Sequence, residues 1–350
     1  MMSDAYAFVS LAFRILFGIS IVMTSITANA QSRSDRLNLA AYFAASTRNA
    51  AFPVKDSKGS LAILLVNFET GKRKKLGIRG SHLLSPYLSP DRKRLLFVRH
   101  PFGEGGREIV SCDTESLLCR SVLKSDGSIS SPVEISDGRI LYVESPKVPG
   151  LKGDARYHRN DFWLLDQAGR ALQLTNMRLY QISSIGVTEN AVYFSAYGPP
   201  RDNPIIPKYD PDLSKQSEIF KLPFDRALRK IESPSRPLEP LFLDYGISQS
   251  PSVSPDGSLI AYLRTTNLGN YRYDLVIEDQ GSHETRLITA AGFGFSRPAV
   301  VGKSVYANLI NEDRHWIQVA EPGQRTMKRL AEVTDASINS VEITYIKFEQ

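Results

Sequence analysis

The chain has 350 residues, of which 42% are hydrophobic and 23% charged, and its formal net charge is +6. These proportions are typical of a globular protein and exclude a disordered chain and an integral membrane protein. The basic residues are spread along the sequence, and the one conspicuous block, Lys72–Lys75, is too short for a nucleic-acid-binding arm. We therefore expect no nucleic-acid partner.

The first thirty residues have the pattern of a secretory signal peptide. Arg14 precedes an apolar run, Ile15–Met23, and a stretch of small residues ends in Ala28-Asn29-Ala30. Cleavage is expected after Ala30. The alternative is an uncleaved membrane anchor, because the apolar segment is nearly long enough to span a bilayer. The sequence thus predicts a periplasmic or secreted protein, with no stable membrane insertion once the signal has been removed.

The next segment, residues 31–59, is polar and rich in alanine, and we interpret it as a lead-in to the main domain, residues 60–350. Within that domain, Cys112 and Cys119 flank a turn-like stretch, Asp113–Ser116, between two β-type runs. A hairpin would bring the two cysteines near each other, and an exported protein meets an oxidising compartment. The sequence permits a disulfide here. Two reduced thiols are the alternative, because cross-strand disulfide geometry is restrictive.

After the lead-in, short β-type runs alternate with turn-forming residues, which indicates a sandwich, a barrel or a propeller. An internal repeat favours the propeller. Ser85–Val98, Ser131–Val143 and Ser250–Leu263 each contain a Ser-Pro pair, a short strand, a turn with an aspartate and an apolar strand with an aromatic residue. Weaker copies begin at Ser184 and Ser296. The aromatic markers of the five copies are Phe97, Tyr142, Phe194, Tyr262 and Tyr306.

Each copy is followed by two further strands, which makes a four-stranded blade. The two ends of the chain supply one more blade in this interpretation. Ser60–Asn67 and Arg73–Leu76 look like third and fourth strands, and Ser340–Ile343 and Tyr345–Phe348 look like the missing first and second. The predicted fold is all-β: a six-bladed β-propeller of four-stranded blades, with one blade closed by N- and C-terminal strands. Such closure removes the open edge of the ring.

These repeats resemble the TolB-type, WD-repeat-like propeller family, whose mark is a Ser-Pro-Asp-Gly turn before an aromatic strand. The likeness covers most of Leu61–Phe348 and is strongest in Ser85–Val98 and Ser250–Leu263. The resemblance implies the propeller fold and the envelope compartment. TolB itself carries an additional N-terminal α/β domain, for which too few residues precede Leu61, so we expect the propeller without it.

No motif for catalysis, cofactor binding or a metal centre stands out. We find no Gly-x-Ser-x-Gly nucleophile elbow, no phosphate-binding loop, and no histidine with a second ligand at short spacing. We therefore name no catalytic, cofactor-binding or metal-ligating residue. Asp91, Asp137 and Asp256 recur by position and are interpreted as turn formers.

The long loops predict a binding face. In a propeller, connections between second and third strands share one face of the ring with connections between blades, and nearly all the long loops here are of these two kinds. Function concentrates in loops on a rigid scaffold, and arginine and tyrosine are typical of interfaces. The alternative is a solvated loop surface with no dedicated ligand. The candidate binding residues are Arg107, Arg156, Tyr157, His158, Arg159, Arg178, Arg201, Tyr209, Tyr271 and Arg272.

The sequence favours a non-catalytic binding or scaffold propeller of the bacterial cell envelope. We expect a monomer that docks a protein or an anionic polymer on its long-loop face and uses no cofactor. One alternative is an enzyme similar to the polysaccharide lyases or other carbohydrate-active propellers, in which an arginine would neutralise a uronate. A purely structural role, with the ring stabilising a complex, is the third hypothesis.

Overall fold

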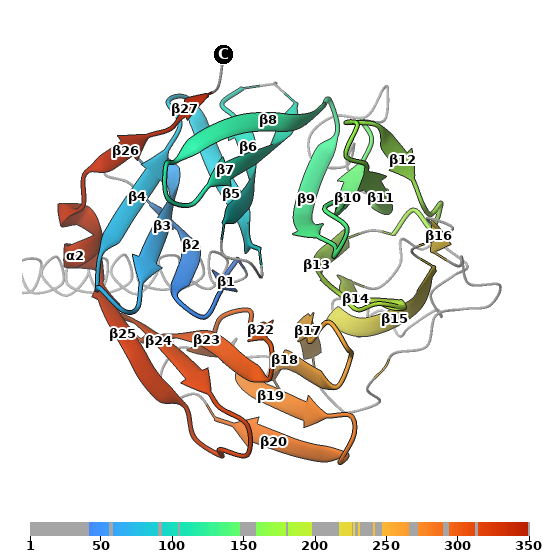
Figure 1. Ribbon diagram of the computed structural model, residues 1–350, viewed down its shortest axis with the longest axis vertical. Coiled ribbons are helices and arrows are strands. Elements are labelled where there is room, and N and C mark those ends of the chain that lie inside the picture. The colour runs from blue at the N-terminus through green and yellow to red at the C-terminus, as the bar shows by residue number, and fades with distance from the viewer. Residues whose placement is uncertain are drawn as a thin grey trace, which may run out of the picture. The chain divides into compact units, whose positions relative to one another are not determined.

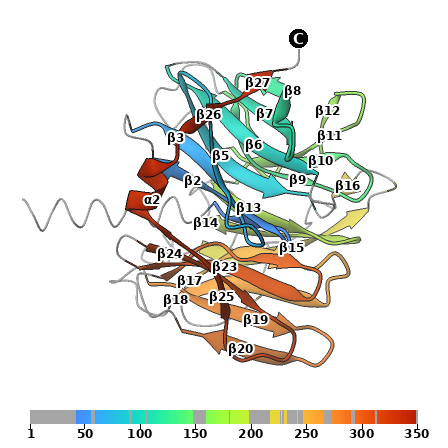
Figure 2. The ribbon, with the colours of Figure 1, turned by 60° about the vertical axis from the view of Figure 1, so that its left-hand side comes forward.

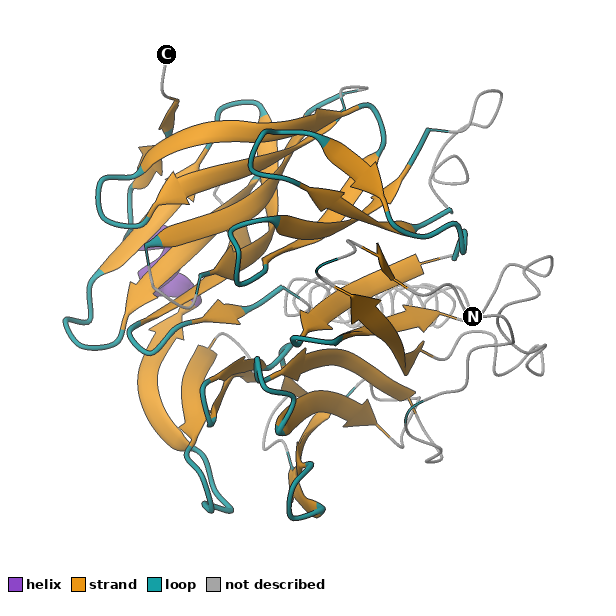
Figure 3. Cartoon of the chain, turned by 45° about the vertical axis from the view of Figure 1, so that its right-hand side comes forward, coloured by secondary structure: helices purple, strands orange, loops and turns teal. Residues whose placement is uncertain are grey.

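The computed structural model describes residues 42–55, 59–89, 93–103, 106–147, 159–179, 181–197, 217–225, 227, 230–231, 241, 247–265, 272–289, 294–311 and 314–348. Within these residues, six small sheets stand around a common axis (Figure 1), and strands dominate, with one short helix (Figure 3). The predicted all-β, six-bladed propeller is therefore confirmed. The predicted signal peptide lies outside the described residues. In the described ranges, no helix is long and apolar enough to cross a bilayer.

Each of the first three blades is built from strands that follow one another in the sequence, with the first strand nearest the axis. Blade 1 contains β1 (Ala44–Ala45), β2 (Asn49–Lys55), β3 (Leu61–Asn67) and β4 (Arg73–Gly77). Blade 2 contains β5 (Ser81–Leu88), β6 (Arg94–Pro101), β7 (Arg107–Asp113) and β8 (Leu118–Ser125). Blade 3 contains β9 (Ser128–Glu134), β10 (Ile140–Ser145), β11 (Asp161–Leu165) and β12 (Ala171–Gln173).

The last three blades repeat this order. Blade 4 contains β13 (Gln181–Val187), β14 (Ala191–Tyr197), β15 (Ser217–Asp225) and β16 (Lys230–Ile231). Blade 5 contains β17 (Ile247–Val253), β18 (Leu259–Thr265), β19 (Asp274–Asp279) and β20 (Glu284–Ile288). In blade 6 the inner strand is broken into β21 (Gly294–Phe295) and β22 (Ala299–Val301), followed by β23 (Ser304–Asn311), β24 (Arg314–Ala320) and β25 (Lys328–Thr334).

The aromatic markers of the repeat lie in the second strands and fill the interior. Each of the five is at most 6% exposed. In blade 1, Phe52 of β2 takes a corresponding place and is 2% exposed. Buried apolar side chains form six clusters among the described residues, and each cluster joins two neighbouring blades, the pair 6 and 1 included. Packing between blades therefore holds the ring together.

The Ser-Pro pairs of the repeat form β-bulges in the inner strands. In β5 the pairing with β6 slips between Leu84 and Tyr87, so that Ser85 and Pro86 fall outside the regular ladder. The same slip falls at the Ser-Pro pairs of β9 and β17. The three serines have φ angles of 49°, 50° and 58°, which non-glycine residues rarely adopt. A bulge accommodates proline, which has no N–H to give to a ladder.

The ends of the chain meet in a different way from the prediction. The first and second strands of blade 1 are β1 and β2, which lie in the segment interpreted as a lead-in. The assignment of the C-terminal strands to these two places is wrong. Pro53 and the neighbouring alanines make β2 hard to recognise as a strand in the sequence, because proline is rare within paired strands and alanine carries little β-propensity.

The last described residues cross the outer edges of blades 1 and 2 (Figure 2). After α2 (Asp335–Ser340), β26 (Ile343–Tyr345) pairs parallel with β4, and β27 (Lys347–Phe348) pairs parallel with β8. Blade 1 thus does contain strands from both ends of the chain, but the C-terminal strand is its outermost. A capping box between Thr334 and Ser337 starts α2, which turns the chain away from the ring interior. We call residues 343–348 the C-terminal strap.

Turns within the blades follow the predicted chemistry. Asp137 accepts a hydrogen bond from the backbone N–H of Arg139, at 3.1 Å, and Asp256 accepts one from the backbone N–H of Ser258, at 3.0 Å. Both aspartates therefore act as turn formers. Asp91 lies outside the described residues.

Cys112 and Cys119 face each other across β7 and β8 and are joined by a disulfide. Their Cα atoms are 4.1 Å apart, and both side chains are buried. The Asp113 carboxylate braces the turn between them, because its Oδ1 accepts hydrogen bonds from the backbone N–H groups of Glu115 and Ser116, at 3.0 and 2.7 Å. This hairpin is therefore closed covalently at its base and by hydrogen bonds at its tip.

Candidate binding face and ring axis

The strand order gives the ring two different faces. The long-loop face carries the connections between second and third strands and those between blades. The short-turn face carries the remaining turns, between first and second and between third and fourth strands. Every third strand begins at the long-loop face, so a side chain at the start of β7, β11 or β19 lies there.

Four of the ten candidate binding residues lie in the described part of the chain, and all four fall at the long-loop ends of strands or in blade connections: Arg107, Arg159, Arg178 and Arg272. The last three are exposed and Arg107 is half-buried. The others lie outside the described residues: Arg156, Tyr157, His158, Arg201, Tyr209 and Tyr271.

Arg107 is the first residue of β7 and connects two blades. Its Nη1 donates to the backbone carbonyl of Ile129 in β9, at 3.1 Å. The residue before it must be glycine, because a Cβ on Gly106 would overlap the carbonyl oxygen of Ser125. The backbone of blade 2 therefore passes close to the next connection and places the Arg107 guanidinium beside blade 3.

Around Arg107, blade 2 gathers basic and aromatic side chains on the long-loop face. His82 and His100 are directly opposite in β5 and β6, with ring centroids 6.4 Å apart. The ring of Phe102, which is 51% exposed, lies 4.7 Å from that of His82. Arg99 forms an ion pair with Glu108 at 3.2 Å. An exposed aromatic ring among cations is the composition that interfaces favour.

The histidines of this group are held in defined states. The backbone N–H of Leu61 donates to Nδ1 of His82, at 3.1 Å, which places any proton of the neutral ring on Nε2. Burial lowers the pKa of His100, and the positive charges of Arg107 and His82 lower it further. The lowered pKa favours the neutral ring of His100, which can accept a hydrogen bond or a proton.

Asp161, at the start of β11, fixes the connection that carries Arg178. Its Oδ1 accepts hydrogen bonds from Thr175 Oγ1 at 2.9 Å and from the backbone N–H groups of Met177 and Arg178, at 2.5 and 3.3 Å. Burial raises the pKa of Asp161 to about 6, against these hydrogen bonds and the Arg178 charge, which lower it. A β-bridge between Asn160 and Leu179 brings this connection beside the chain that carries Arg159.

The side chain of Arg297 lies at the ring axis. Arg297 comes from the break between β21 and β22 in blade 6, and its Nη2 donates to the backbone carbonyl of Ile185 in blade 4, at 2.8 Å. Blades 4 and 6 are not neighbours, so the guanidinium reaches past the inner strand of blade 5. Tyr87 of blade 2 donates its hydroxyl to the carbonyl of Glu134 in blade 3, at 3.1 Å.

Arg297 is electrostatically coupled to two tyrosines. Burial lowers its pKa to about 10, against the opposing influence of Tyr42 and Tyr87. Burial raises the pKa of Tyr42, and the charges of Arg107 and Arg297 oppose that shift. Arg107 on the long-loop face and Arg297 at the axis therefore both influence the pKa of Tyr42.

No sequence pattern predicted a functional role for Arg297, Tyr42 or Tyr87. One signal was present in the repeat. The copies in blades 2, 3 and 5 have Ser-Pro at the bulge, whereas blade 6 has Arg297-Pro298. Blade 6 thus departs from the repeat, because a large cation stands in place of a serine at a position next to the axis.

A metal centre is not evident in the part of the chain that the structure describes, where no three His, Cys, Asp or Glu side chains converge. No protein-family profile matches the chain, and no curated protein matches it either. Solved structures, in contrast, do match the chain. TolB from Acinetobacter baumannii superposes with a TM-score of 0.58 at 15% identity, over 80% of this chain and 63% of that one. The tricorn protease superposes with a TM-score of 0.54 at 10% identity, over 83% of this chain and 26% of that one.

The ring of four-stranded sheets and its inter-blade cores define the class as a six-bladed β-propeller. The fold is that of the TolB-type propeller, as the superposition on the Acinetobacter baumannii protein shows. The chain spans less than two thirds of that protein and about a quarter of the tricorn protease, and at these identities the likeness concerns the fold alone.

Proposed function

We propose that this protein is a non-catalytic binding propeller of the bacterial cell envelope that docks an acidic segment of a protein partner on its long-loop face, next to the axis. The gathering of Arg107, His82 and His100 at the long-loop end of blade 2 carries the proposal. Arginines beside half-buried aromatic rings are typical of the residues that dominate binding energy. The neighbouring Phe102 supplies exposed apolar surface.

Two observations support the envelope location. The N-terminal thirty residues have the signal-peptide pattern. The disulfide between Cys112 and Cys119 suits an oxidising compartment, because such bonds are rare in the cytosol.

Charge reversal on the long-loop face tests the docking. The tagged protein is exported in its natural host, cross-linked in the intact envelope and purified, as wild type and as the double variant R159E/R272E. Both arginines are exposed, so the variant should fold. The control is K303E/K328E, which reverses two exposed charges on the short-turn face. We expect the R159E/R272E variant to lose a cross-linked partner that the control retains. An unchanged set of partners would overturn the proposal.

One observation favours an enzymatic alternative. The pKa of His100 is lowered, in part by the charge of Arg107, and a base beside a charge-neutralising group is the pairing that a uronate lyase needs. The test is to incubate the protein with polygalacturonate and follow the ultraviolet absorbance of unsaturated products. Activity in the wild type that H100Q abolishes would favour the lyase hypothesis. Absence of activity in the wild type would exclude that hypothesis.

A further inference from the structure

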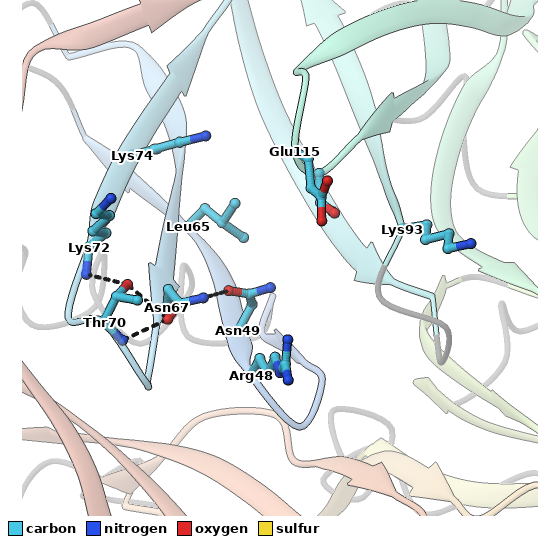
Figure 4. Close-up of a pocket in the computed structure, with 10 residues that line it drawn as sticks. Arg48, Asn49, Leu65, Asn67, Thr70, Lys72, Lys74, Lys93 and Glu115 are labelled. Carbon is cyan, nitrogen blue, oxygen red and sulfur yellow. Dashed lines mark hydrogen bonds between the residues drawn. The ribbon is translucent and has the colours of Figure 1, made fainter.

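A groove of about 610 Å³ opens between blades 1 and 2 on the short-turn face, opposite to the long-loop face. Its described walls come from β3, β4 and the turns β1–β2 and β3–β4 of blade 1, and from Lys93 and the β7–β8 turn of blade 2. Figure 4 shows Lys72 and Lys74 on the blade 1 wall, and Glu115 and Lys93 on the blade 2 wall. The charge block Lys72–Lys75 is conspicuous in the sequence, but its pattern alone predicted no role. The fold places the exposed members of this block at the groove.

The groove is built on braced turns. In blade 1, Asn67 Oδ1 accepts hydrogen bonds from the backbone N–H groups of Glu69 and Thr70, at 3.1 and 2.9 Å, while its Nδ2 donates to Asn49 Oδ1 at 3.0 Å. In blade 2, Asp113 braces the opposite turn in the same way, and the disulfide closes its base. The C-terminal strap joins the outer strands of the two blades. One described turn in each wall is therefore braced before any ligand arrives, which lowers the entropic cost of binding.

The side chains that line the groove carry more positive than negative charge. Arg48, Lys72, Lys74 and Lys93 line it together with one acid, Glu115, which leaves a formal charge of +3 from four cations and one anion. Arg48 forms an ion pair with Glu69, at 2.9 Å. Among the described residues, no ion pair joins Lys72 or Lys74 to a carboxylate. Figure 4 shows that the Lys74 side chain extends from β4 into the space between the blades.

The remaining lining narrows the class of ligand. Apart from the charged groups, it consists of the amides of Asn49 and Asn67, the hydroxyls of Thr70 and Thr114, and a single apolar side chain, Leu65. A peptide normally needs apolar or aromatic anchors, and single-stranded nucleic acid needs aromatic platforms. The volume lies within the range of about 300–1,000 Å³ that is usual for small-molecule sites and far exceeds what one inorganic ion fills. Ammonium groups beside amides and hydroxyls match the carboxylates and hydroxyls of an acidic sugar.

We infer that the groove between blades 1 and 2 binds a short acidic oligosaccharide, with Lys72 and Lys74 pairing with its carboxylates. The site is distinct from the long-loop face and does not depend on the function proposed for that face.

The test is isothermal titration calorimetry of the exported protein with trigalacturonate at low salt and at physiological salt. Maltotriose is the neutral control of equal length, and triglutamate is the acidic peptide control. The double variant K72Q/K74Q removes two exposed charges. The matched variant K303Q/K328Q removes two exposed charges from the same face at blade 6. Equal melting temperatures of the three proteins show that the substitutions leave the fold intact.

We expect the wild type to bind trigalacturonate and not maltotriose, with affinity that falls as salt rises. K72Q/K74Q should weaken this binding at least tenfold, and K303Q/K328Q should change it less than twofold. R159E/R272E, on the other face, should leave it unchanged, so that a failure here is separable from a failure of the proposed protein docking. Absence of binding by the wild type, equal affinity of K72Q/K74Q, or tighter binding of triglutamate would each overturn the inference.

Discussion

Arg297 in blade 6 donates its Nη2 hydrogen to the backbone carbonyl of Ile185 in blade 4, across a distance of 2.8 Å. The contact links two blades that are not neighbours in the ring, so it restrains the inner strands at the axis. Packing between adjacent blades supplies most of the cohesion of the ring, and Arg297 adds a connection that skips one blade.

Replacing Arg297 by leucine should destabilise the protein by about 1–3 kcal/mol, because the Ile185 carbonyl loses this donor. Equilibrium unfolding in urea measures the change. R159L, at an exposed position on the long-loop face, should change stability by less than about 0.5 kcal/mol. Equal stabilities of R297L and the wild type would show that the contact at the axis contributes little.

The raised pKa of Asp161 makes stability depend on pH. Its folded-state value of about 6 lies above the ordinary value of 3.8, so the folded protein holds the proton that the unfolded chain releases. The contribution of this group is full below about pH 4 and is lost as the pH rises through 6. D161N cannot titrate and retains an oxygen acceptor for Thr175, Met177 and Arg178. Relative to the wild type, it should gain about 2–3 kcal/mol between pH 4 and pH 7.5.

Unfolding free energies of both proteins at several pH values test this prediction, and D166N is the control. Asp166 lies in the turn of the same blade, and hydrogen bonds from Arg170 lower its pKa. The contribution of Asp166 is present above its ordinary value of 3.8 and is lost only as the pH falls below it, so the stability difference between D166N and the wild type should stay nearly constant between pH 4 and pH 7.5. A difference between D161N and the wild type that stays constant with pH would contradict the assignment.

Reduction of the disulfide should cost about 2–3 kcal/mol of stability, since the two cysteines are separated by 7 residues and a short loop restricts the unfolded chain only modestly. Denaturation with and without dithiothreitol gives the value. C112S/C119S should be insensitive to the reductant. Two titratable thiols in the exported, unreduced protein would show instead that the cysteines are not bridged.

Much of the ring follows from the sequence because its repeat has a local cause. A Ser-Pro bulge, an aspartate turn and a buried aromatic such as Tyr142 or Tyr262 recur from blade to blade. Each of these features can be recognised within about a dozen residues of sequence. Blade 1 lacks the Ser-Pro pair, and its second strand carries Pro53, so its inner half escaped notice. The groove between blades 1 and 2 could not be predicted for the same reason, since one of its turns joins β1 to β2.

Other features depend on contacts that are distant in the sequence. Nothing in the apolar pattern of residues 343–348 distinguishes a parallel strand at the outer edge from an inner antiparallel one, because both bury alternate side chains. The role of Arg297 likewise depends on which blades meet at the axis. Its replacement of a repeat serine was visible, but the partner on blade 4 was not.

The C-terminal strap covers the outer edges of β4 and β8, and removing it should expose both. Unpaired strand edges promote association between chains. Truncation after Val341 should therefore lower the melting temperature, increase aggregation on heating, and speed hydrogen exchange at residues 74–77 and 118–119, which the strap pairs with or adjoins. T344P removes one N–H from β26, so it should lower the melting temperature and speed hydrogen exchange to a smaller extent than the truncation. T344A should show neither effect. Because β27 joins the hairpin that bears Glu115, the truncation should also loosen the blade 2 wall of the groove. Exchange rates in β4 and β8 that match the wild type would mean that the strap does not stay paired in solution.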